Sequence, residues 1–320
     1  MVRGGGKETG WRRIRNVLRI SYTIPFVTAS AVGSAFALTV KQEWLMALLI
    51  PLDVFLLAMF VNLSNDYFDH KSGADSKRFA RRDPEFEAGL KNVINDKFYW
   101  SGNSFDDGEI SEKGGKQLLA VIAIAAALLA VPILLYGGWV VVLLGAIAFF
   151  LAYFYTAPPL NLGARGLGEL DVFISFAMMA YFSYYVIDPV LNWQMVCIAI
   201  TVGFAVMLMR FVDQMSGYDA HVAAGEKDWC VRLGLERAVS ATIVLLAVFY
   251  GLCLVLIWQS PYFVFTLLTL PVTFKLVKHL RVKEDRYRFI RSAPLMLQIA
   301  FMHMLWVIFA LAMRSAVTGP

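Results

Sequence analysis

The chain has 320 residues, of which 59% are hydrophobic and 17% are charged, and its formal net charge at pH 7 is +5. A soluble domain carries roughly 25% charged residues, so this composition excludes an ordinary soluble protein. The three cysteines and four histidines are scattered and show no spacing typical of a disulfide framework or a zinc site. The basic residues lie mainly on one side of the predicted membrane spans, so the positive net charge reflects membrane topology. We therefore expect no nucleic-acid partner.

Apolar runs of about 20 residues, the length that crosses a bilayer as a helix, recur along the chain. We delimit nine of them and therefore expect an all-α polytopic membrane protein with nine transmembrane helices. The runs lie near residues 19–39, 44–64, 117–135, 138–156, 170–187, 193–212, 238–258, 261–277 and 293–313. The seventh and eighth are separated by a short Ser-Pro turn in "WQSPYF".

Lysine and arginine are distributed very unevenly between the two sides of this topology. One side holds the N-terminus and the segments near 65–116, 157–169, 213–237 and 278–292. That side carries all of the 29 Lys and Arg residues except Lys41 and Arg314. The positive-inside rule makes it the cytoplasmic side, which predicts a cytoplasmic N-terminus and a multi-pass protein of the cell membrane. The basic run "KLVKHLRVKEDRYRFIR" is typical of contact with anionic membrane lipid.

The first polar cluster follows the second apolar run, in "VNLSNDYFDHKSGAD". On a helix, with about 100° per residue, Asn62, Asn65, Asp66 and Asp69 share one face, and Asp75 follows after a glycine. Carboxylates gathered on one stripe repel each other, and a divalent cation relieves that repulsion. Mg²⁺ takes one or two carboxylates and completes its shell with waters and phosphate oxygens. The alternative is a solvated helix end whose acids pair with the following basic residues.

The second polar cluster follows the sixth apolar run, in "MRFVDQMSGYDAHVAAGEKDWCVRLG". Asp213 and Asp219 are its candidate metal ligands, and Arg210 and Lys227 supply nearby positive charge. A metal would neutralise the inner oxygens of a diphosphate, and the cations would neutralise the outer ones. The two acids are six residues apart, so they face one site only if the helix breaks around Gly217. An ordinary charged loop is the alternative.

The connection between the fourth and fifth runs reads "YFYTAPPLNLGARGLGELDVF". Its Pro-Pro pair ends the fourth helix, and its glycines allow a tight re-entry into the membrane. Tyr153, Tyr155 and Arg165 are then expected near the same inner mouth. Anchoring at the membrane interface is the alternative for the tyrosines.

These three segments, in this order, resemble the UbiA superfamily of intramembrane prenyltransferases, and in particular the 1,4-dihydroxy-2-naphthoate polyprenyltransferase branch. The resemblance extends from residue 11 to about residue 240. It implies a helical bundle around a lipid-open cavity, in which two Asp-rich motifs bind Mg²⁺ and a prenyl diphosphate. It also implies transfer of a polyprenyl group to an aromatic acceptor, with demethylmenaquinone and loss of the carboxylate as the outcome for the naphthoate.

The assignment that results takes Asp66, Asp69 and Asp213 as catalytic residues. The expected metal ligands are Asn62, Asp66, Asp69, Asp75, Asp213 and Asp219. The expected substrate-binding residues are Asn62, Asn65, Tyr153, Tyr155, Arg165, Arg210 and Lys227. The expected partners are a polyprenyl diphosphate, an aromatic acceptor and membrane lipid, with no obligate protein partner. We expect one domain over 1–320, in which residues 72–115 form a cytoplasmic loop or cap.

The second motif departs from the pattern of the family it resembles. Gly217 and His221 stand where acids are usual, Glu226 replaces a lysine and Asp228 replaces a threonine. Three alternatives stay open: the same fold with another quinone or tetrapyrrole precursor, the same fold with an archaeal glycerol-phosphate lipid, and a membrane transporter.

Overall fold

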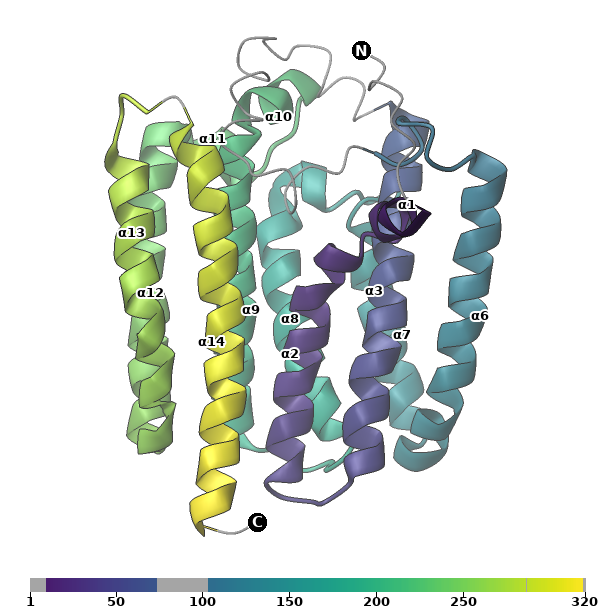
Figure 1. Ribbon diagram of the computed structural model, residues 1–320, viewed down its shortest axis with the longest axis vertical. Helices are drawn as coiled ribbons and strands as arrows, with labels where there is room; N and C mark the ends of the chain where they lie inside the picture. Colours follow the sequence, from purple (N-terminus) through teal and green to yellow (C-terminus); the bar gives the residue numbers. More distant parts are fainter. Residues whose placement is uncertain (1–9, 74–102, 286, 319–320) are drawn as a thin grey trace.

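Every regular element in the part of the chain that the structure describes is a helix. The computed structural model describes residues 10–73, 103–285 and 287–318. The elements in chain order are α1 (Gly10–Val17), α2 (Ile20–Leu38), α3 (Trp44–Ser72), α6 (Glu112–Gly137), α7 (Trp139–Phe154), the π-helical turn η1 (Gly163–Leu167), α8 (Gly168–Tyr185), α9 (Trp193–Ser216), α10 (Tyr218–Ala224), α11 (Trp229–Leu233), α12 (Leu235–Gln259), the 3₁₀ helix η2 (Pro261–Thr269), α13 (Leu270–Arg281) and α14 (Arg288–Thr318) (Figure 1). The predicted ligand Asp75 and most of the predicted 72–115 cap lie outside the described residues.

Seven helices among the described residues are long and apolar enough to cross a membrane. They are α2, α3, α6, α9, α12, η2 with α13, and α14. The predicted runs 138–156 and 170–187 correspond to the shorter helices α7, with 16 residues, and α8, with 18. The all-α membrane architecture is therefore confirmed.

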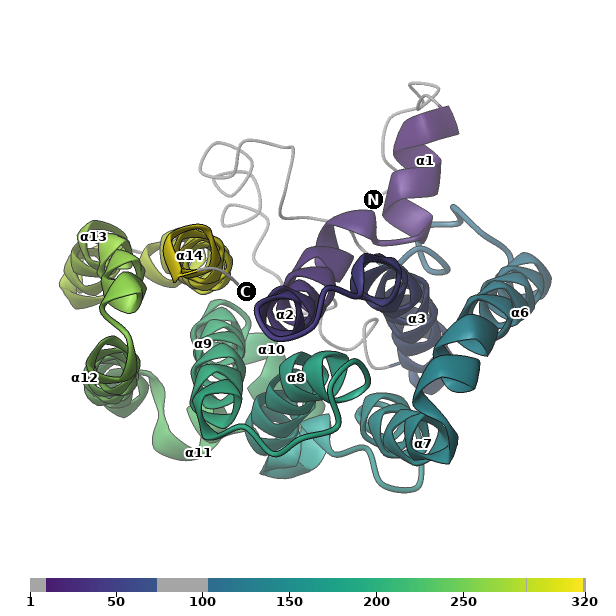
Figure 2. The ribbon, with the colours of Figure 1, turned by 90° about the horizontal axis from the view of Figure 1, so that it is seen from below.

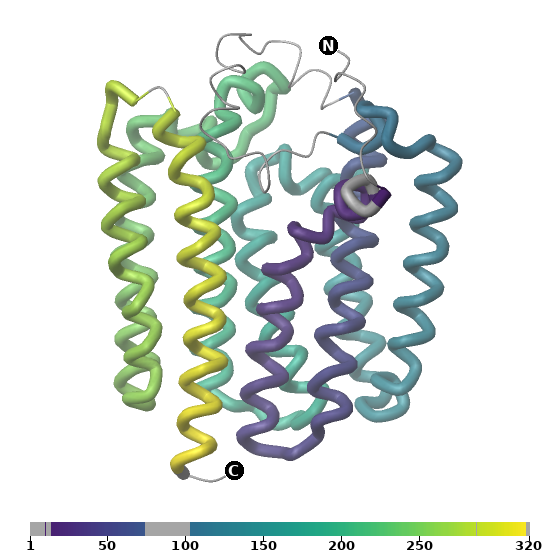
Figure 3. Tube along the Cα trace, viewed as in Figure 1, coloured from purple at the N-terminus to yellow at the C-terminus, as the bar shows by residue number. Residues whose placement is uncertain are grey.

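The helices form a bundle whose middle is occupied by α2, α8 and α9, with α3, α6 and α7 on one side and α12, α13 and α14 on the other (Figure 2). Successive long helices run in opposite directions (Figure 3). The carboxyl-terminal ends of α3 and α9 therefore lie at the same end of the bundle, where α1 and α10 are also found (Figure 1). Both predicted polar clusters lie at this end.

The central helices approach closely because small residues line their contacts. A Cβ on Gly33 of α2 would overlap the carbonyl oxygen of Ala180 on α8, and a Cβ on Gly203 of α9 would overlap that of Phe173 on α8. A buried hydrogen bond of 2.8 Å joins the hydroxyls of Ser30 and Ser183 across the first of these contacts. Small residues and interhelical hydrogen bonds are the usual means of association within lipid.

The two basic residues that break the charge asymmetry are each held by a polar neighbour. Lys41 Nζ donates to Tyr136 Oη at 2.7 Å, which raises the pKa of the lysine ammonium. Arg314 Nη1 donates to Gln194 Oε1 at 2.6 Å. Both exceptions thus have local hydrogen-bonding roles.

We predict that Gly33→Ala and Gly203→Ala each destabilise the bundle. The added methyl group meets backbone, which cannot rotate away, and overpacking of this kind typically costs about 1–3 kcal/mol. Thermal unfolding of the detergent-solubilised protein should show a lower midpoint for both variants.

Gly145→Ala on α7 is the matched control, because a Cβ at this position meets nothing within 4 Å. Its midpoint should equal that of the wild type or exceed it slightly. Equal midpoints for all three variants would contradict the close packing of α2, α8 and α9.

Candidate active site

The first acidic segment forms the last turns of α3. The helix runs without interruption to Ser72 and ends at Gly73, whose φ of 65° lies in the left-handed region. The helical prediction is therefore confirmed, and Asn62, Asp66 and Asp69 share one face. Asn62 and Asp66 are buried, whereas Asp69 is half-buried.

The Asp66 carboxylate is neutralised by Arg19, which precedes α2. Arg19 Nη2 lies 2.5 Å from Asp66 Oδ1, and Arg19 Nε donates to Asp66 Oδ2 at 3.0 Å. This two-point geometry is the strong form of an arginine–carboxylate pair. The Arg19 backbone has φ 47° and ψ 42°, a left-handed conformation that costs a non-glycine residue free energy unless the surroundings hold it. Arg19 is a residue of this site that the sequence alone did not predict.

Residues 103–112 fold onto the end of α3. Asn103 Nδ2 donates to the Asp66 carbonyl at 2.7 Å. The Phe105 ring stacks on His70, with 5.6 Å between centroids. Lys71 Nζ lies 2.7 Å from Glu112 Oε2 at the start of α6. The acidic turn is therefore held by α2 on one side and by the segment before α6 on the other.

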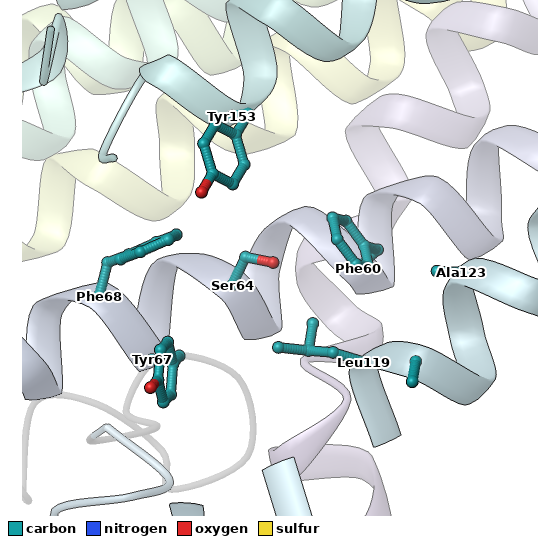
Figure 4. Close-up of a pocket in the computed structure, with 8 residues that line it drawn as sticks. Phe60, Ser64, Tyr67, Phe68, Leu119, Ala123 and Tyr153 are labelled. Atoms are coloured by element: carbon teal, nitrogen blue, oxygen red, sulfur yellow. The ribbon is translucent and has the colours of Figure 1, made fainter. Parts of the chain in front are cut away.

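A pocket of about 220 Å³ lies between α3, α6 and α7 (Figure 4). Its lining residues are Phe60, Ser64, Tyr67, Phe68, Leu119, Ala120, Ala123 and Tyr153. The Tyr153 ring meets Phe68 edge-on at 5.5 Å. Ser64 and Phe68 lie about 200° around α3 from Asp66, so this aromatic pocket is on a different face of the helix from the acids.

The second polar cluster centres on Arg210 and Gln214 of α9. The Arg210 guanidinium lies 5.0 Å from the centroid of the Tyr155 ring. With its amide oriented to satisfy both neighbours, Gln214 donates to Glu169 Oε1 at 2.7 Å and accepts from Arg210 Nη2 at 3.3 Å. The structure thus brings together the predicted residues Tyr155 and Arg210, and adds Glu169 and Gln214.

Several buried polar atoms in this cluster have no hydrogen-bond partner within the described ranges. They are Tyr155 Oη, Glu169 Oε2, Asp171 Oδ1 and Arg210 Nε. Native structures rarely leave such groups unpaired, so each is a candidate contact for water or a ligand. The cluster is chemically able to bind a polar group of a substrate.

The helix that carries Asp213 ends close to Gly217, where an interruption is needed if Asp213 and Asp219 are to face one site. α9 ends at Ser216 and α10 begins at Tyr218, so the predicted interruption at Gly217 is present. Asp213 and Asp219 are both exposed. Asn65, on α3, is half-buried.

The connection between α7 and α8 packs against the connection between α10 and α11. The backbone N–H of Lys227 donates to the Ala164 carbonyl at 2.9 Å, and Arg232 Nη2 donates to the Arg165 carbonyl at 3.0 Å. Gly166, with φ 83°, lies where a Cβ would overlap the Lys227 carbonyl. Arg165 is exposed and donates to the Pro159 carbonyl at 2.8 Å.

A histidine and two acids meet beside this contact. His221 Nδ1 lies 2.6 Å from Asp228 Oδ2 and 3.1 Å from Glu226 Oε2. Burial disfavours the charged imidazole, but the hydrogen bonds to Asp228 and Glu226 outweigh it and raise the pKa of His221 above its ordinary value. The sequence signal for this cluster was the departure of the same three positions from the second motif.

Residues 105–305 match the model of the UbiA prenyltransferase family. The 2-carboxy-1,4-naphthoquinone phytyltransferase of Synechocystis sp. (strain ATCC 27184 / PCC 6803 / Kazusa) is 26% identical over 277 residues, which cover 83% of this chain and 81% of that protein. The chloroplastic 2-carboxy-1,4-naphthoquinone phytyltransferase of Arabidopsis thaliana is 25% identical over 277 residues, which cover 82% of this chain and 65% of that protein.

Solved structures share the fold at low sequence identity. A UbiA homolog from Archaeoglobus fulgidus bound to DMAPP and Mg²⁺ has a TM-score of 0.66 at 17% identity, covering 94% of this chain and 99% of that chain. The apo UbiA homolog from Aeropyrum pernix K1 has a TM-score of 0.64 at 16% identity, covering 90% and 98%. Since the family match spans more than half of the chain and the described residues form several long apolar helices, this chain belongs to the UbiA prenyltransferase family and is a membrane-bound prenyltransferase.

Proposed function

We propose that this enzyme transfers a polyprenyl group from an allylic diphosphate to 1,4-dihydroxy-2-naphthoate in a Mg²⁺-dependent reaction. The reaction releases diphosphate and CO₂ and gives the quinol form of demethylmenaquinone. The observation that carries this proposal is the similarity, over about four fifths of the chain, to two 2-carboxy-1,4-naphthoquinone phytyltransferases. The acceptor in their name is the oxidised form of the same naphthoate. Family membership favours prenyl transfer over the transporter alternative.

We further propose one domain over residues 1–320 with nine transmembrane helices, formed by the seven long apolar helices together with α7 and α8. The distribution of Lys and Arg supports an N-terminus and an active site that face the cytoplasm. The segment 72–115 would then cover the site from that side, and the cell membrane would be its location.

The donor atoms on α3 fit a magnesium ion. Asn62, Asp66 and Asp69 offer carboxylate and amide oxygens on one face, which are the ligands that Mg²⁺ prefers. The Asp66 carboxylate already binds one positive group, the Arg19 guanidinium, so a second positive charge from a metal ion would also be attracted to this position. Asp75, Asp213 and Asp219 complete the proposed ligand set. When bound, Mg²⁺ would stabilise the charge that develops on the leaving diphosphate.

The chain's own side chains would position the two substrates. Arg19 and Arg210 present guanidinium groups suited to diphosphate oxygens, and we assign Asn65, Arg165 and Lys227 to the same anion. Tyr155 lies against Arg210 and would orient the polar edge of a substrate. Tyr153 lines an apolar aromatic pocket, which suits a hydrocarbon chain or ring. Apolar surroundings would exclude water from the allylic cation.

In the presence of Mg²⁺, membranes that contain the enzyme should convert 1,4-dihydroxy-2-naphthoate and a polyprenyl diphosphate into the quinol of demethylmenaquinone. Mass spectrometry would detect this product, or the quinone that forms from it on exposure to oxygen. Asp66→Asn and Asp69→Asn should each lower the rate by a factor of about 100 or more, because groups that stabilise transition-state charge typically contribute that much.

Asp285→Asn is the matched control, because Asp285 pairs with Arg291 in the α13–α14 region and should leave the rate unchanged. Product with a different acceptor, and none with the naphthoate, would contradict the proposed acceptor while leaving prenyl transfer intact.

Asp213→Asn and Asp219→Asn test the second half of the metal site. Asp213 precedes the break at Gly217 and Asp219 follows it. Loss of either proposed ligand should raise the Mg²⁺ concentration that gives half-maximal turnover. Mg²⁺ titration of the initial rate measures this directly. The assignment is wrong if both variants show the titration curve of the wild type.

Arg19→Gln should destabilise the protein in the absence of metal, because it removes the guanidinium that binds both oxygens of the buried Asp66 carboxylate. Breaking a buried ion pair from one side costs about 3 kcal/mol. Mg²⁺ should then raise the thermal midpoint of Arg19→Gln more than that of the wild type, since the ion replaces the lost guanidinium.

The double variant Arg19→Gln/Asp66→Asn removes both charges, so it should regain stability and lose the response to Mg²⁺. Equal Mg²⁺ responses in the wild type and Arg19→Gln would show that the ion does not bind at Asp66.

A further inference from the structure

One exposed stripe of side chains runs along η2 and α13. Its members recur every three or four residues, as one face of a continuous helix requires. They are Val264, Leu268, Pro271, Phe274, Lys278 and Arg281. α13 lies at the edge of the bundle beside α12 and α14 (Figure 2), and its buried residues Thr273, Leu276 and Leu280 lie on its other side. The stripe therefore faces the surroundings of the bundle.

The chemical character of this stripe changes along its length. Val264, Leu268 and Phe274 are all exposed, the last of them by 70%. One turn further on, Lys278 and Arg281 replace them, and α13 ends at Arg281, at the same end of the bundle as α10 (Figure 1). A phospholipid beside a membrane helix has the complementary order, with its acyl chains in the bilayer core and its phosphate at the interface.

The cations of α13 lack a counterion in the part of the chain that the structure describes. Lys275 lies beside the stripe, so the side chains of Lys275, Lys278 and Arg281 are exposed on neighbouring turns. None of the three makes an ion pair or a hydrogen bond with another described residue, and Glu284, which is exposed three residues after Arg281, does not pair with it. The helix dipole favours cations in the last turn, but their charge stays open to an anion from outside.

Two acids at this corner of the bundle are already bound by other cations. Glu236 Oε1 accepts from Arg288 Nη2 at 2.7 Å, and Glu236 Oε2 lies 3.2 Å from Lys283 Nζ. Asp285 Oδ2 accepts from Arg291 Nη1 at 2.8 Å. The basic residues that follow α13 thus have partners within the protein, whereas those on α13 are left for an external anion.

A second copy of this chain is a poor occupant of the stripe. In the symmetric pairing that is usual for homodimers, a patch meets the same patch of its partner. Such a contact would bring these cations together, and like charges repel each other. An anionic phospholipid offers the opposite charge to the basic end of the stripe and hydrocarbon to its apolar part.

We propose that η2 and α13 bind one anionic phospholipid on this stripe. Lys275, Lys278 and Arg281 bind its phosphate, and an acyl chain lies along Leu268 and Phe274. The site does not depend on prenyl transfer, since none of these side chains belongs to either polar cluster of the candidate active site.

The test measures lipid binding to the purified full-length protein. Delipidated protein in a neutral detergent is titrated with phosphatidylglycerol or phosphatidylcholine, and native mass spectrometry counts the bound lipid. The wild type should bind one phosphatidylglycerol at concentrations that leave phosphatidylcholine unbound. Lys278→Gln/Arg281→Gln should weaken phosphatidylglycerol binding about 25-fold, because each basic residue near an anionic lipid surface contributes about a factor of five.

Lys113→Gln/Lys116→Gln is the matched control, because it removes two exposed cations from the start of α6, at the same end of the bundle (Figure 1). This variant should bind phosphatidylglycerol as the wild type does. All four substituted side chains are exposed, so both double variants should keep the thermal midpoint of the wild type. Equal affinities of the wild type for the two lipids, or equal losses in the two double variants, would overturn the proposal.

Phe274→Ala separates a bound lipid from a bound free anion. Loss of the exposed ring removes a contact with the acyl chain, so the affinity for phosphatidylglycerol should fall severalfold. An unchanged affinity in this variant, together with displacement of the lipid by millimolar inorganic phosphate, would show that the cations bind free phosphate and would contradict the proposal.

Discussion

The Asp66 carboxylate is buried at the end of an apolar helix, and the chain stabilises it by placing Arg19 against both of its oxygens. A charge at this depth is tolerated only when it is paired. To meet this requirement, Arg19 takes a left-handed backbone conformation immediately before α2, and Asn103 binds the backbone of the same turn. Asp66 therefore links three parts of the fold at the end of α3: its carboxylate binds Arg19 before α2, and its backbone carbonyl binds the segment before α6.

The second polar cluster meets the same requirement with different groups. Glu169 is fully buried, and its Oε1 accepts hydrogen bonds from Gln214 and from the Trp229 backbone. Arg210 lies on the other side of Gln214 and against Tyr155. The two clusters thus each set a guanidinium beside buried acids at one end of the bundle, as the recognition of an anionic metal–diphosphate group would require.

The sequence predicted the elements well because lipid imposes long apolar runs, and helical periodicity assigns Asn62, Asp66 and Asp69 to one face. It could not predict their partners, because these depend on tertiary contacts between distant positions. Arg19 is 47 residues from Asp66. Glu169 lies in the first turn of α8, where acidic residues are common, yet it binds the backbone of a residue 60 positions later.

Tyr153 and Tyr155 show that tertiary contacts are also hard to predict for two residues that are close in the sequence. They were predicted together, yet Tyr153 packs against Phe68 beside α3, whereas Tyr155 packs against Arg210 of α9. The change of direction occurs where α7 ends at Phe154. Since α2 and α8 separate α3 from α9 (Figure 2), the spacing of the two polar clusters depends on how closely the central helices pack. Gly33 and Gly203, which carry no chemistry themselves, therefore help to determine how far apart the two polar clusters lie.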